Sequence, residues 1–442
     1  MSHLAATLAG GVERAPQRAV TQWARSGLMA LSGPAHGPPA APAVDAMARI
    51  AALLRHLEQA SAAAGQARHF DPCLLTERAA LSGLARGGSA SCNRSCRLLK
   101  ANDGWIAINL ARDVDREALP ALLGCGVEEE PWSALLRLTP RMRVGQFVEA
   151  GRHLGVAVAP VSLPGERSPE LPLERIFPVQ RLARGEPAPQ SWTRAPPLVI
   201  DLSALWAGPL CAQLLGQAGA RVIKVESVRR PDSIRATAPE FFDRLNAGKQ
   251  SVALDLTGTA DRMRLRQLIA RADILISSAR PRAFEQLDLV PEKLMAANPR
   301  LTWLAITAYG WSGPASHAIG FGDDVAAAAG LLTWSEHGVP MFAGDAIADP
   351  LTGIAAAAAA VASQRRGGGV LIDASLCAAA AYVARARPLG EPERGRVARA
   401  RGGWCVQVDG TSARVSPPRA RPHTGHATPF GADTHRVLSE LA

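Results

Sequence analysis

Residues 199–226 read VIDLSALWAGPLCAQLLGQAGARVIKVE and contain the pattern that decides the fold class. The first apolar residues give way to a Gly-Pro turn at 207–209, and apolar residues then recur at helical spacing until Gly219. The apolar run at 222–225 is typical of a buried parallel strand. The stretch therefore predicts a strand, a turn, a helix and a second strand, which together form part of a parallel α/β sheet.

A unit of this kind places a helix N-terminus at the carboxyl edge of the sheet, where backbone N–H groups can bind a phosphate. The glycines of the turn do not spell G-x-G-x-x-G, however. Crossover helices also occur in α/β cores that bind nothing at this edge. The pattern by itself leaves open both a nucleotide-binding role and a purely structural one.

Four further motifs follow in order along the chain. They are LNAGKQSVALDL at 245–256, ADILISSARPRAFEQLDL at 272–289, NPRLTWLAITAYGWSGP at 298–314 and GDDVAAAAG at 322–330. In this order the motifs resemble the family III CoA-transferases, the CaiB/BaiF group, whose relatives include the α-methylacyl-CoA racemases. The resemblance runs from about 197 to 377 and resumes in the tail at 425–442.

The resemblance implies a fold, an activity and partners. The expected fold is α/β, with a large domain on a parallel Rossmann-like sheet and a smaller α/β domain. The implied activity is transfer of CoA between an acyl-CoA thioester and a carboxylic acid acceptor, with coenzyme A as substrate and product thioester and with no metal. Family members form homodimers, and we expect a homodimer here.

The family resemblance places the catalytic group in the motif at 322–330. In the family, an aspartate at this point attacks the donor thioester to give a mixed anhydride and then an aspartyl-CoA thioester. A carboxylate suits this role because it is ordinarily ionised at neutral pH without a general base. Matching Gly322 to the family's glycine selects Asp324, with Asp323 as the second candidate. The same pair could instead be an N-cap and a first-turn residue of a helix.

Two alternative functions remain open at this point. The racemases that the chain resembles carry a histidine just before the aspartate, whereas this chain has Asp323 there, which favours a transferase. Asp349 is a second aspartate of the family pattern, but transferases and racemases share it, and it could serve only as a helix cap. The alternatives are a racemase-like isomerase and a non-catalytic CoA-binding descendant.

Three cations are implied to contact the phosphates of CoA. They are Arg235 of PDSIR, Lys249 of LNAGKQSV and Arg280 of SARPR. Relatives read N-R-G-K where this chain has N-A-G-K, and N-F-R-P-G where it has S-A-R-P-R, so both motifs of the CoA pocket are altered. Each cation could also be a solvated surface charge.

Two more pairs of residues complete the expected site. Leu205 and Trp206 lie beside the first turn, where pantetheine or adenine could pack, although Trp206 could equally belong to the core. Gly310 and Gly313 of GWSGP are expected to form a tight loop beside the active aspartate, with backbone N–H groups available to an oxyanion.

The order of the domains differs from that of the relatives, which carry the small domain in the middle of their sequence. The expected division is a degenerate helical region at 1–97, a small α/β domain at 98–162, a linker rich in proline and charge at 163–197, the CoA-binding large domain with the active aspartate at 198–388, and its C-terminal part at 389–442. Residues 23–57 also echo residues 326–362, either as a partial repeat or because alanine-rich helices share a composition.

Composition excludes several other classes of protein. The net charge is +10, but the arginines are scattered without interleaved aromatic residues, so we expect no nucleic-acid partner. Seven cysteines, an odd number over 442 residues, argue against a disulfide framework, and the Cys92–Cys96 pair lacks a second pair for a zinc site. The N-terminal residues lack the basic-then-apolar pattern of a signal segment. The apolar run at 354–361 is too short to cross a bilayer and is expected to form a tightly packed internal helix. We therefore expect a soluble cytoplasmic protein without a membrane partner.

Overall fold

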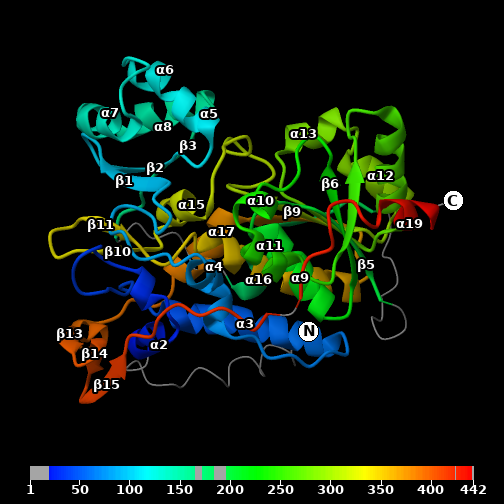
Figure 1. Cartoon of the computed structure of the whole chain (residues 1–442). Coiled ribbons are helices and arrows are strands. Elements are labelled where there is room, and N and C mark those ends of the chain that lie inside the picture. The colour runs from blue at the N-terminus through cyan, green and yellow to red at the C-terminus, as the bar shows by residue number, and fades with distance from the viewer. Residues whose placement is uncertain (1–18, 165–171, 184–195, 424, 441–442) are drawn as a thin grey trace.

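The computed structural model describes residues 19–164, 172–183, 196–423 and 425–440. Its centre is a seven-stranded sheet in the order β4-β12-β9-β8-β5-β6-β7, in which only β4 runs antiparallel to its neighbour (Figure 1). The strands are β4 (Val179–Arg181), β5 (Leu198–Leu202), β6 (Arg221–Ser227), β7 (Gln250–Leu254), β8 (Ile274–Ser277), β9 (Thr302–Thr307) and β12 (Val370–Ser375). The sheet confirms the expected α/β fold class.

The opening stretch folds as its pattern predicts. β5 is followed by helix α9 (Ala207–Gln217) and then by β6, which lies parallel to β5. Because successive side chains of a strand point to opposite faces, Val199 packs with α9 on one face and Ile200 packs on the other. Both side chains are fully buried, as expected for a central strand covered on both faces.

Helices cover both faces of this sheet. One face packs on α9 and on two long helices, α3 (Ala46–Ala63) and α16 (Ala348–Arg365). The opposite face packs on α12 (Thr259–Arg271), α13 (Pro281–Gln286) and α14 (Pro291–Ala297). Shorter helices complete this part of the chain: α10 (Ile234–Thr237), α11 (Pro239–Asn246) and α17 (Leu376–Ala384). The result is a three-layer arrangement with the functional loops at the carboxyl ends of the strands.

Helix α16 is largely enclosed. Six of its eight alanines are buried, and the helix packs between α9 and α3, which confirms the expected internal helix over residues 354–361. A Cβ atom added at Gly353 would lie 2.7 Å from the carbonyl oxygen of Ala207. Small residues along α16 therefore let its N-terminal half approach the start of α9. The turn before α9, with Leu205, and the start of α16, with Asp349, are thereby brought together.

A smaller α/β unit precedes the large sheet in the sequence and lies above it in Figure 1. Its antiparallel strands are β1 (Cys96–Lys100), β2 (Trp105–Asn109) and β3 (Ala157–Pro160), and its helices are α5 (Asp113–Glu117), α6 (Leu119–Leu123), α7 (Pro131–Leu138) and α8 (Val144–His153). Strands β2 and β3 contact α15 (Gly322–Ala328), the helix that carries the aspartate pair. The small unit therefore covers the expected active residues within the same chain.

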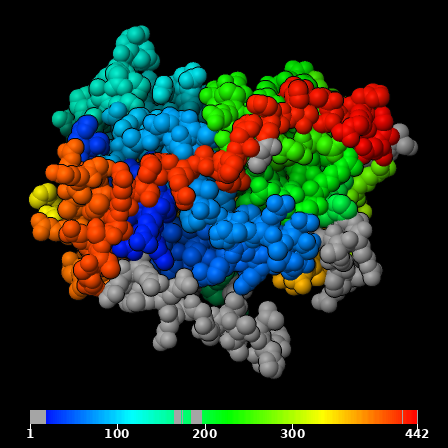
Figure 2. Space-filling model, turned by 60° about the horizontal axis from the view of Figure 1, so that its bottom comes forward, coloured from blue at the N-terminus to red at the C-terminus, as the bar shows by residue number. Residues whose placement is uncertain are grey.

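The C-terminal part of the described chain contacts both the first described helix and the edge of the large sheet. Helix α2 (Ala19–Arg25) lies against the three-stranded sheet β13 (Arg396–Ala400), β14 (Gly403–Val408) and β15 (Thr411–Arg414). The segment after β15 then crosses the surface to α19 (Thr434–Ser439), which contacts β7 (Figure 2). The remaining helices and strands are α4 (Glu77–Leu81), the hairpin of β10 (Leu332–Trp334) and β11 (Pro340–Phe342), and α18 (Glu391–Arg394).

The proposed domain boundaries can be compared with these elements. β4 lies within the range expected as a linker, and β13–β15 form a sheet of their own within residues 389–442. In the described part of the chain, no helix is both long and apolar enough to cross a membrane.

Candidate active site

Four aspartates meet where helices α15 and α16 begin. Asp323 and Asp324 lie in the first turn of α15, Asp349 lies in the first turn of α16, and Asp345 precedes α16. The two helix starts are joined by a hydrogen bond. The backbone N–H of Ala346, just before α16, donates to Asp323 Oδ1 on α15 at 2.8 Å. We call these four residues the acid cluster.

Gly322 occupies a position that has no room for a side chain. A Cβ atom there would lie 2.3 Å from the carbonyl oxygen of Ala346 and 2.4 Å from Asp349 Oδ2. Both distances are far below any normal contact, so a glycine is required for α15 and α16 to meet. Asp349 therefore lies directly beside Gly322 at the start of α15.

The two oxygens of the Asp324 carboxyl group have different surroundings. Oδ1 accepts hydrogen bonds from Asn109 Nδ2 at 3.1 Å and from the Phe321 N–H at 3.0 Å. Oδ2 is buried and has no hydrogen-bond partner among the described residues. Burial raises the pKa of Asp324 to about 7, against the opposing effect of the bonds from Asn109 and Phe321. The structure thus corrects the expectation of a carboxylate fully ionised at neutral pH.

Asp324 is accompanied by two residues that also have a buried polar atom without a partner among the described residues. These atoms are Asn109 Oδ1 and the hydroxyl oxygen of Tyr309. Burial raises the pKa of Tyr309, and the charge of nearby Asp324 raises it further. Because buried polar atoms are normally hydrogen-bonded, unpaired groups on Asn109, Tyr309 and Asp324 mark a place where a polar ligand atom could bind.

Asp323 belongs to the other side of the acid cluster. Arg78 of α4 binds Asp345 through two hydrogen bonds, 2.8 Å from Nε and 2.6 Å from Nη2. Burial raises the pKa of Asp323 to about 8; the Asp345 carboxylate adds to this rise, and Arg78 opposes it. Asp323 is therefore mostly protonated at neutral pH, and its Oδ1 accepts from a backbone N–H group. Of the two candidates, Asp324 has the more readily ionised carboxyl group and an unpaired oxygen.

Sequence patterns did not indicate Asn109 or Arg78. Each lies in the first half of the chain, more than 200 positions from the aspartate that it binds. Asn109 lies within the range 98–162 expected as the small domain, and no motif quoted from the sequence includes it. Nothing near Arg78 distinguishes it from the many other arginines.

The turn between β5 and α9 holds the first expected pair of CoA contacts. Leu205 is 38% exposed and has a φ of +68°, and its N–H lies 3.2 Å from both carboxylate oxygens of Asp232. Trp206 is only 2% exposed and packs edge-to-face on Phe241 at 5.1 Å, with the Arg78 guanidinium over its ring. Leu205 is thus available to a ligand. Trp206 is a core residue, which was the second of the two possibilities that its sequence position allowed.

Lys249 is used inside the fold and does not face solvent. Its Nζ atom donates at 2.9 Å to Asp201 Oδ2, to the Pro209 carbonyl oxygen and to Asn246 Oδ1. Burial lowers the pKa of Lys249 to about 8, although the Asp201 carboxylate opposes this fall. The expectation that Lys249 contacts a phosphate of CoA is therefore corrected. Its ammonium group instead links β5, through Asp201, to the start of α9, through the Pro209 carbonyl oxygen.

The two expected arginines lie closer to solvent. Arg235 is partly buried between Phe242 and Phe430 and donates to Glu226 Oε2 at 2.6 Å. Arg280 is exposed at the start of α13. The N–H of Ala204 donates to Ser278 Oγ at 3.0 Å, so the turns after β5 and β8 lie side by side. Arg280 and Leu205 accordingly share one edge of the sheet.

The glycines of GWSGP differ in their surroundings. Gly310 has a φ of +121°, and its N–H donates to Thr307 Oγ1 at 3.0 Å. This N–H group is therefore already engaged, which corrects its expected role as an oxyanion donor. Gly313 has a φ of +92°, and no atom lies within 4 Å of an added Cβ. Both glycines allow the turn itself, because each adopts a backbone conformation that side chains disfavour.

One group of possible metal ligands occurs among the described residues. Asp243, His423 and His426 bring their ligand atoms within 4.8 Å of one another, with both histidines exposed. His426 Nδ1 lies 2.7 Å from Asp243 Oδ2. This group joins α11 to the C-terminal segment and does not include any residue of the acid cluster.

Comparison with known proteins identifies one family. Residues 197–408 match the model of CoA-transferase family III. A succinate–glutarate CoA-transferase of Agrobacterium fabrum is 34% identical over 180 residues, which are 36% of this chain and 45% of that protein. A human alpha-methylacyl-CoA racemase is 36% identical over 135 residues, which are 30% of this chain and 33% of that protein.

A solved structure gives a weaker similarity. A CaiB/BaiF family protein from Brucella suis is 28% identical, with a TM-score of 0.42, and the match covers 48% of this chain and 64% of that one. The matches to the two curated relatives named above span less than half of the length of each relative.

Proposed function

Residues 197–408 belong to CoA-transferase family III, and from this premise we propose that the protein transfers CoA from an acyl-CoA thioester to a carboxylic acid. The observation that carries the proposal is the Asp324 carboxyl group. It is fully buried, one of its oxygens is unpaired among the described residues, and two further unpaired polar groups lie on Asn109 and Tyr309. Such a site can bind and react with an acyl group out of contact with water.

In the proposed mechanism the ionised Asp324 is the nucleophile. Its carboxylate attacks the thioester carbonyl carbon, the C–S bond breaks, and CoA leaves as the thiolate, which gives a mixed anhydride. The thiolate then attacks the aspartyl carbonyl carbon, which releases the donor acid and forms an aspartyl-CoA thioester. The acceptor carboxylate attacks this thioester and displaces the thiolate. Attack of the thiolate on the acceptor's acyl carbon forms the new acyl-CoA and restores Asp324.

The neighbours of Asp324 have defined roles in this proposal. The amide of Asn109 and the N–H of Phe321 hold Oδ1, which leaves the unpaired Oδ2 as the attacking atom of this proposal. We assign to the unpaired hydroxyl group of Tyr309 the role of donating to a charged oxygen that develops in the transition state. Asp323 and Arg78 support the acid cluster and take no part in bond formation.

The remaining contacts with CoA are proposed at the carboxyl edge of the sheet. Leu205 offers an exposed apolar side chain, and Arg280 an exposed cation, on adjacent turns. Arg235 contributes positive charge from between its two phenylalanine rings. We also propose that the protein acts as a homodimer in the cytoplasm, where acyl-CoA thioesters and free acids are both present.

Intact-protein mass spectrometry tests the proposed function. The protein is incubated with a panel of acyl-CoAs, and Asp324→Asn is compared with Asp323→Asn as the matched control. We expect an adduct in the wild type and in Asp323→Asn, none in Asp324→Asn, and cleavage of the adduct by hydroxylamine. An adduct that persists in Asp324→Asn would overturn the assignment of the nucleophile.

The two alternatives give different results in the same preparation. A racemase-like isomerase would form no adduct and would exchange the α-proton of an acyl-CoA in deuterated water without any acceptor acid. A non-catalytic descendant would bind CoA in a calorimetric titration while showing neither an adduct nor proton exchange. Either pattern would exclude the transferase.

A further inference from the structure

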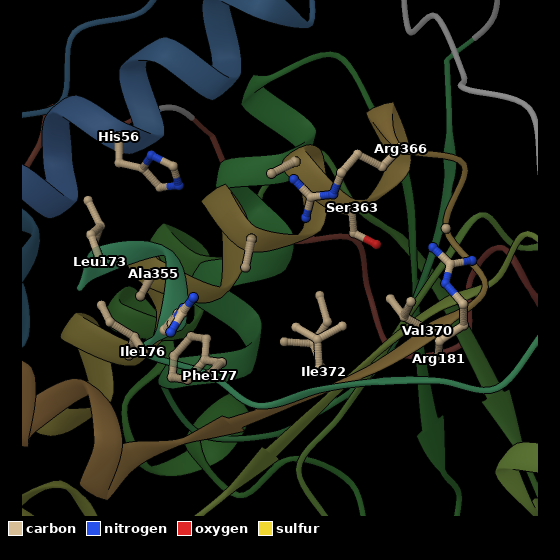
Figure 3. A pocket seen from close by; sticks show the side chains of 15 residues that line it. His56, Leu173, Ile176, Phe177, Arg181, Ala355, Ser363, Arg366, Val370 and Ile372 are labelled. Carbon is tan, nitrogen blue, oxygen red and sulfur yellow. The ribbon is translucent and has the colours of Figure 1, made fainter. Parts of the chain in front are cut away.

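A separate cavity of about 520 Å³ lies on the α16 face of the large sheet. It is enclosed by α3, α16, β12 and the segment 173–181, and Figure 3 shows fifteen side chains lining it. The nearest lining residue of α16, Ala355, follows Asp349 by six residues, which is roughly 9 Å along the helix at a rise of 1.5 Å per residue. The described residues that line this cavity include none of the acid cluster, so the two sites are distinct. Its size is within the range of about 300–1,000 Å³ that is usual for small-molecule sites.

The walls of the cavity are mainly apolar. Ile176 and Phe177 come from the crossing segment, and Val370 and Ile372 come from β12. Alanines of α16 complete the surface; because they have no side chain beyond Cβ, the space between the helix and the crossing segment stays open. An apolar surface of this kind favours a ligand with a hydrocarbon portion.

The polar side chains that line the cavity are basic or neutral. Arg175, Arg181 and Arg366 are exposed, and they form no hydrogen bond or ion pair through their side chains among the described residues. His56 lies across the cavity from Arg181 in Figure 3. Among the residues whose side chains the structure describes, those that line the cavity include no aspartate or glutamate. The described lining thus has three guanidinium groups without a carboxylate to neutralise them, as expected for a site that binds an anion.

We propose that this cavity binds an aliphatic carboxylate, with the hydrocarbon chain along the alanines of α16 and the carboxylate paired with Arg181 and Arg366. The apolar walls would contact the hydrocarbon chain of the ligand, and Arg181 and Arg366 would bind its carboxylate (Figure 3). A guanidinium group can bind a carboxylate through two parallel hydrogen bonds. The site does not depend on the proposed transferase activity, since no residue of the acid cluster lines it.

Binding of dodecanoate, measured by isothermal titration calorimetry with the full chain, tests the proposal. We expect one molecule bound per chain, and binding at least tenfold weaker to the double variant Arg181→Gln/Arg366→Gln, because hydrogen bonds to a charged group contribute about 1.5–3 kcal/mol. Arg396→Gln/Arg399→Gln is the matched control, since it removes two exposed charges on β13 and should bind as the wild type does. Dodecanol, which lacks the charge, should bind at least tenfold more weakly than dodecanoate.

A second variant tests whether the hydrocarbon chain of dodecanoate lies inside the cavity. Ala359→Phe places a large side chain inside the cavity and should abolish dodecanoate binding, while circular dichroism and the melting temperature show that the variant still folds. Dodecanoate binding that survives Ala359→Phe, or equal binding of dodecanol and dodecanoate, would overturn the proposal. Failure of the wild type to bind dodecanoate, together with a sedimentation coefficient that changes in Ala359→Phe, would instead show that a second copy of the chain covers this surface.

Discussion

Asp324 has two oxygens in different surroundings, and this difference controls its chemistry at the scale of the single residue. Oδ1 is held by Asn109 and Phe321, while Oδ2 is unpaired among the described residues. Burial disfavours the charged form, and the two hydrogen bonds favour it. The balance leaves a pKa of about 7, where small changes in pH or in one hydrogen bond alter the ionised fraction strongly.

The first prediction concerns the pH dependence of adduct formation. Only the ionised form of Asp324 can attack, so the rate should rise with pH and level off above a midpoint near 7. A quenched-flow series from pH 5.5 to 8.5 with one acyl-CoA measures it. A rate that is constant over this range would show that the ionisation of Asp324 does not control the reaction.

The second prediction concerns Asn109, a residue that positions the nucleophile. Asn109→Ala removes a hydrogen bond that lowers the pKa of Asp324, so the midpoint should move to higher pH. The rate at pH 7 should fall by about tenfold or more, since a hydrogen bond to a charged group contributes about 1.5–3 kcal/mol. The exposed Asn102 of the same unit provides the control Asn102→Ala, whose profile should match the wild type. A lower rate without a shift of the midpoint would contradict this role.

At the scale of secondary-structure elements, the site depends on how closely α15 and α16 approach each other. Ala346 donates to Asp323, and a Cβ atom at Gly322 would lie 2.3 Å from the Ala346 carbonyl oxygen, so the two helix starts are in close contact. The small unit contributes through β2, whose last residue, Asn109, donates to Asp324. The surroundings of the active carboxyl group therefore come from both halves of the chain.

The third prediction tests this junction. Gly322→Ala would place a methyl group 2.3 Å from the Ala346 carbonyl oxygen, and we expect the free energy of unfolding to fall by about 2–3 kcal/mol. Adduct formation should also be lost, because the helix starts separate. Gly145→Ala in α8 is the control, since no atom lies within 4 Å of its added Cβ. Denaturant titrations in which both variants match the wild type would argue against close packing at this junction.

At the scale of the whole molecule, the acid cluster makes stability depend on pH. Burial raises the pKa of Asp323 to about 8 and that of Asp324 and Asp349 to about 7, all above the ordinary value of 3.8. Between the ordinary pKa of 3.8 and the raised pKa of each group, the folded chain binds protons that the unfolded chain has lost. The contribution of these groups to the free energy of unfolding is therefore greatest below about pH 4 and falls as the pH rises toward 8.

The fourth prediction follows from this linkage. Asp323→Asn removes one titrating group, so its stability relative to the wild type should increase as the pH rises from 5 to 8. Because one pKa unit corresponds to about 1.4 kcal/mol, the relative change should amount to a few kcal/mol. Urea titrations at pH 5, 6.5 and 8 measure it, with Asp103→Asn in an exposed turn as the control. A difference that stays constant with pH would show that Asp323 has an ordinary pKa in the folded chain.

The sequence by itself determined the α/β fold class and indicated the segment with the aspartate pair. Alternating and helical spacing depend on neighbours within a few residues, which is why β5, α9 and β6 formed as predicted. The ordered motifs are local as well, and the family that they resemble is the one whose model residues 197–408 match.

Only the tertiary structure decided which side chains surround the aspartates. Asn109 is 215 positions from Asp324, and Arg78 is 267 positions from Asp345, so no local pattern could pair them. The same holds for Lys249, which looked like a phosphate ligand in its motif but forms its ion pair with Asp201 in the core. The pKa of each carboxyl group depends on burial and on distant charges, and both exist only once the chain has folded.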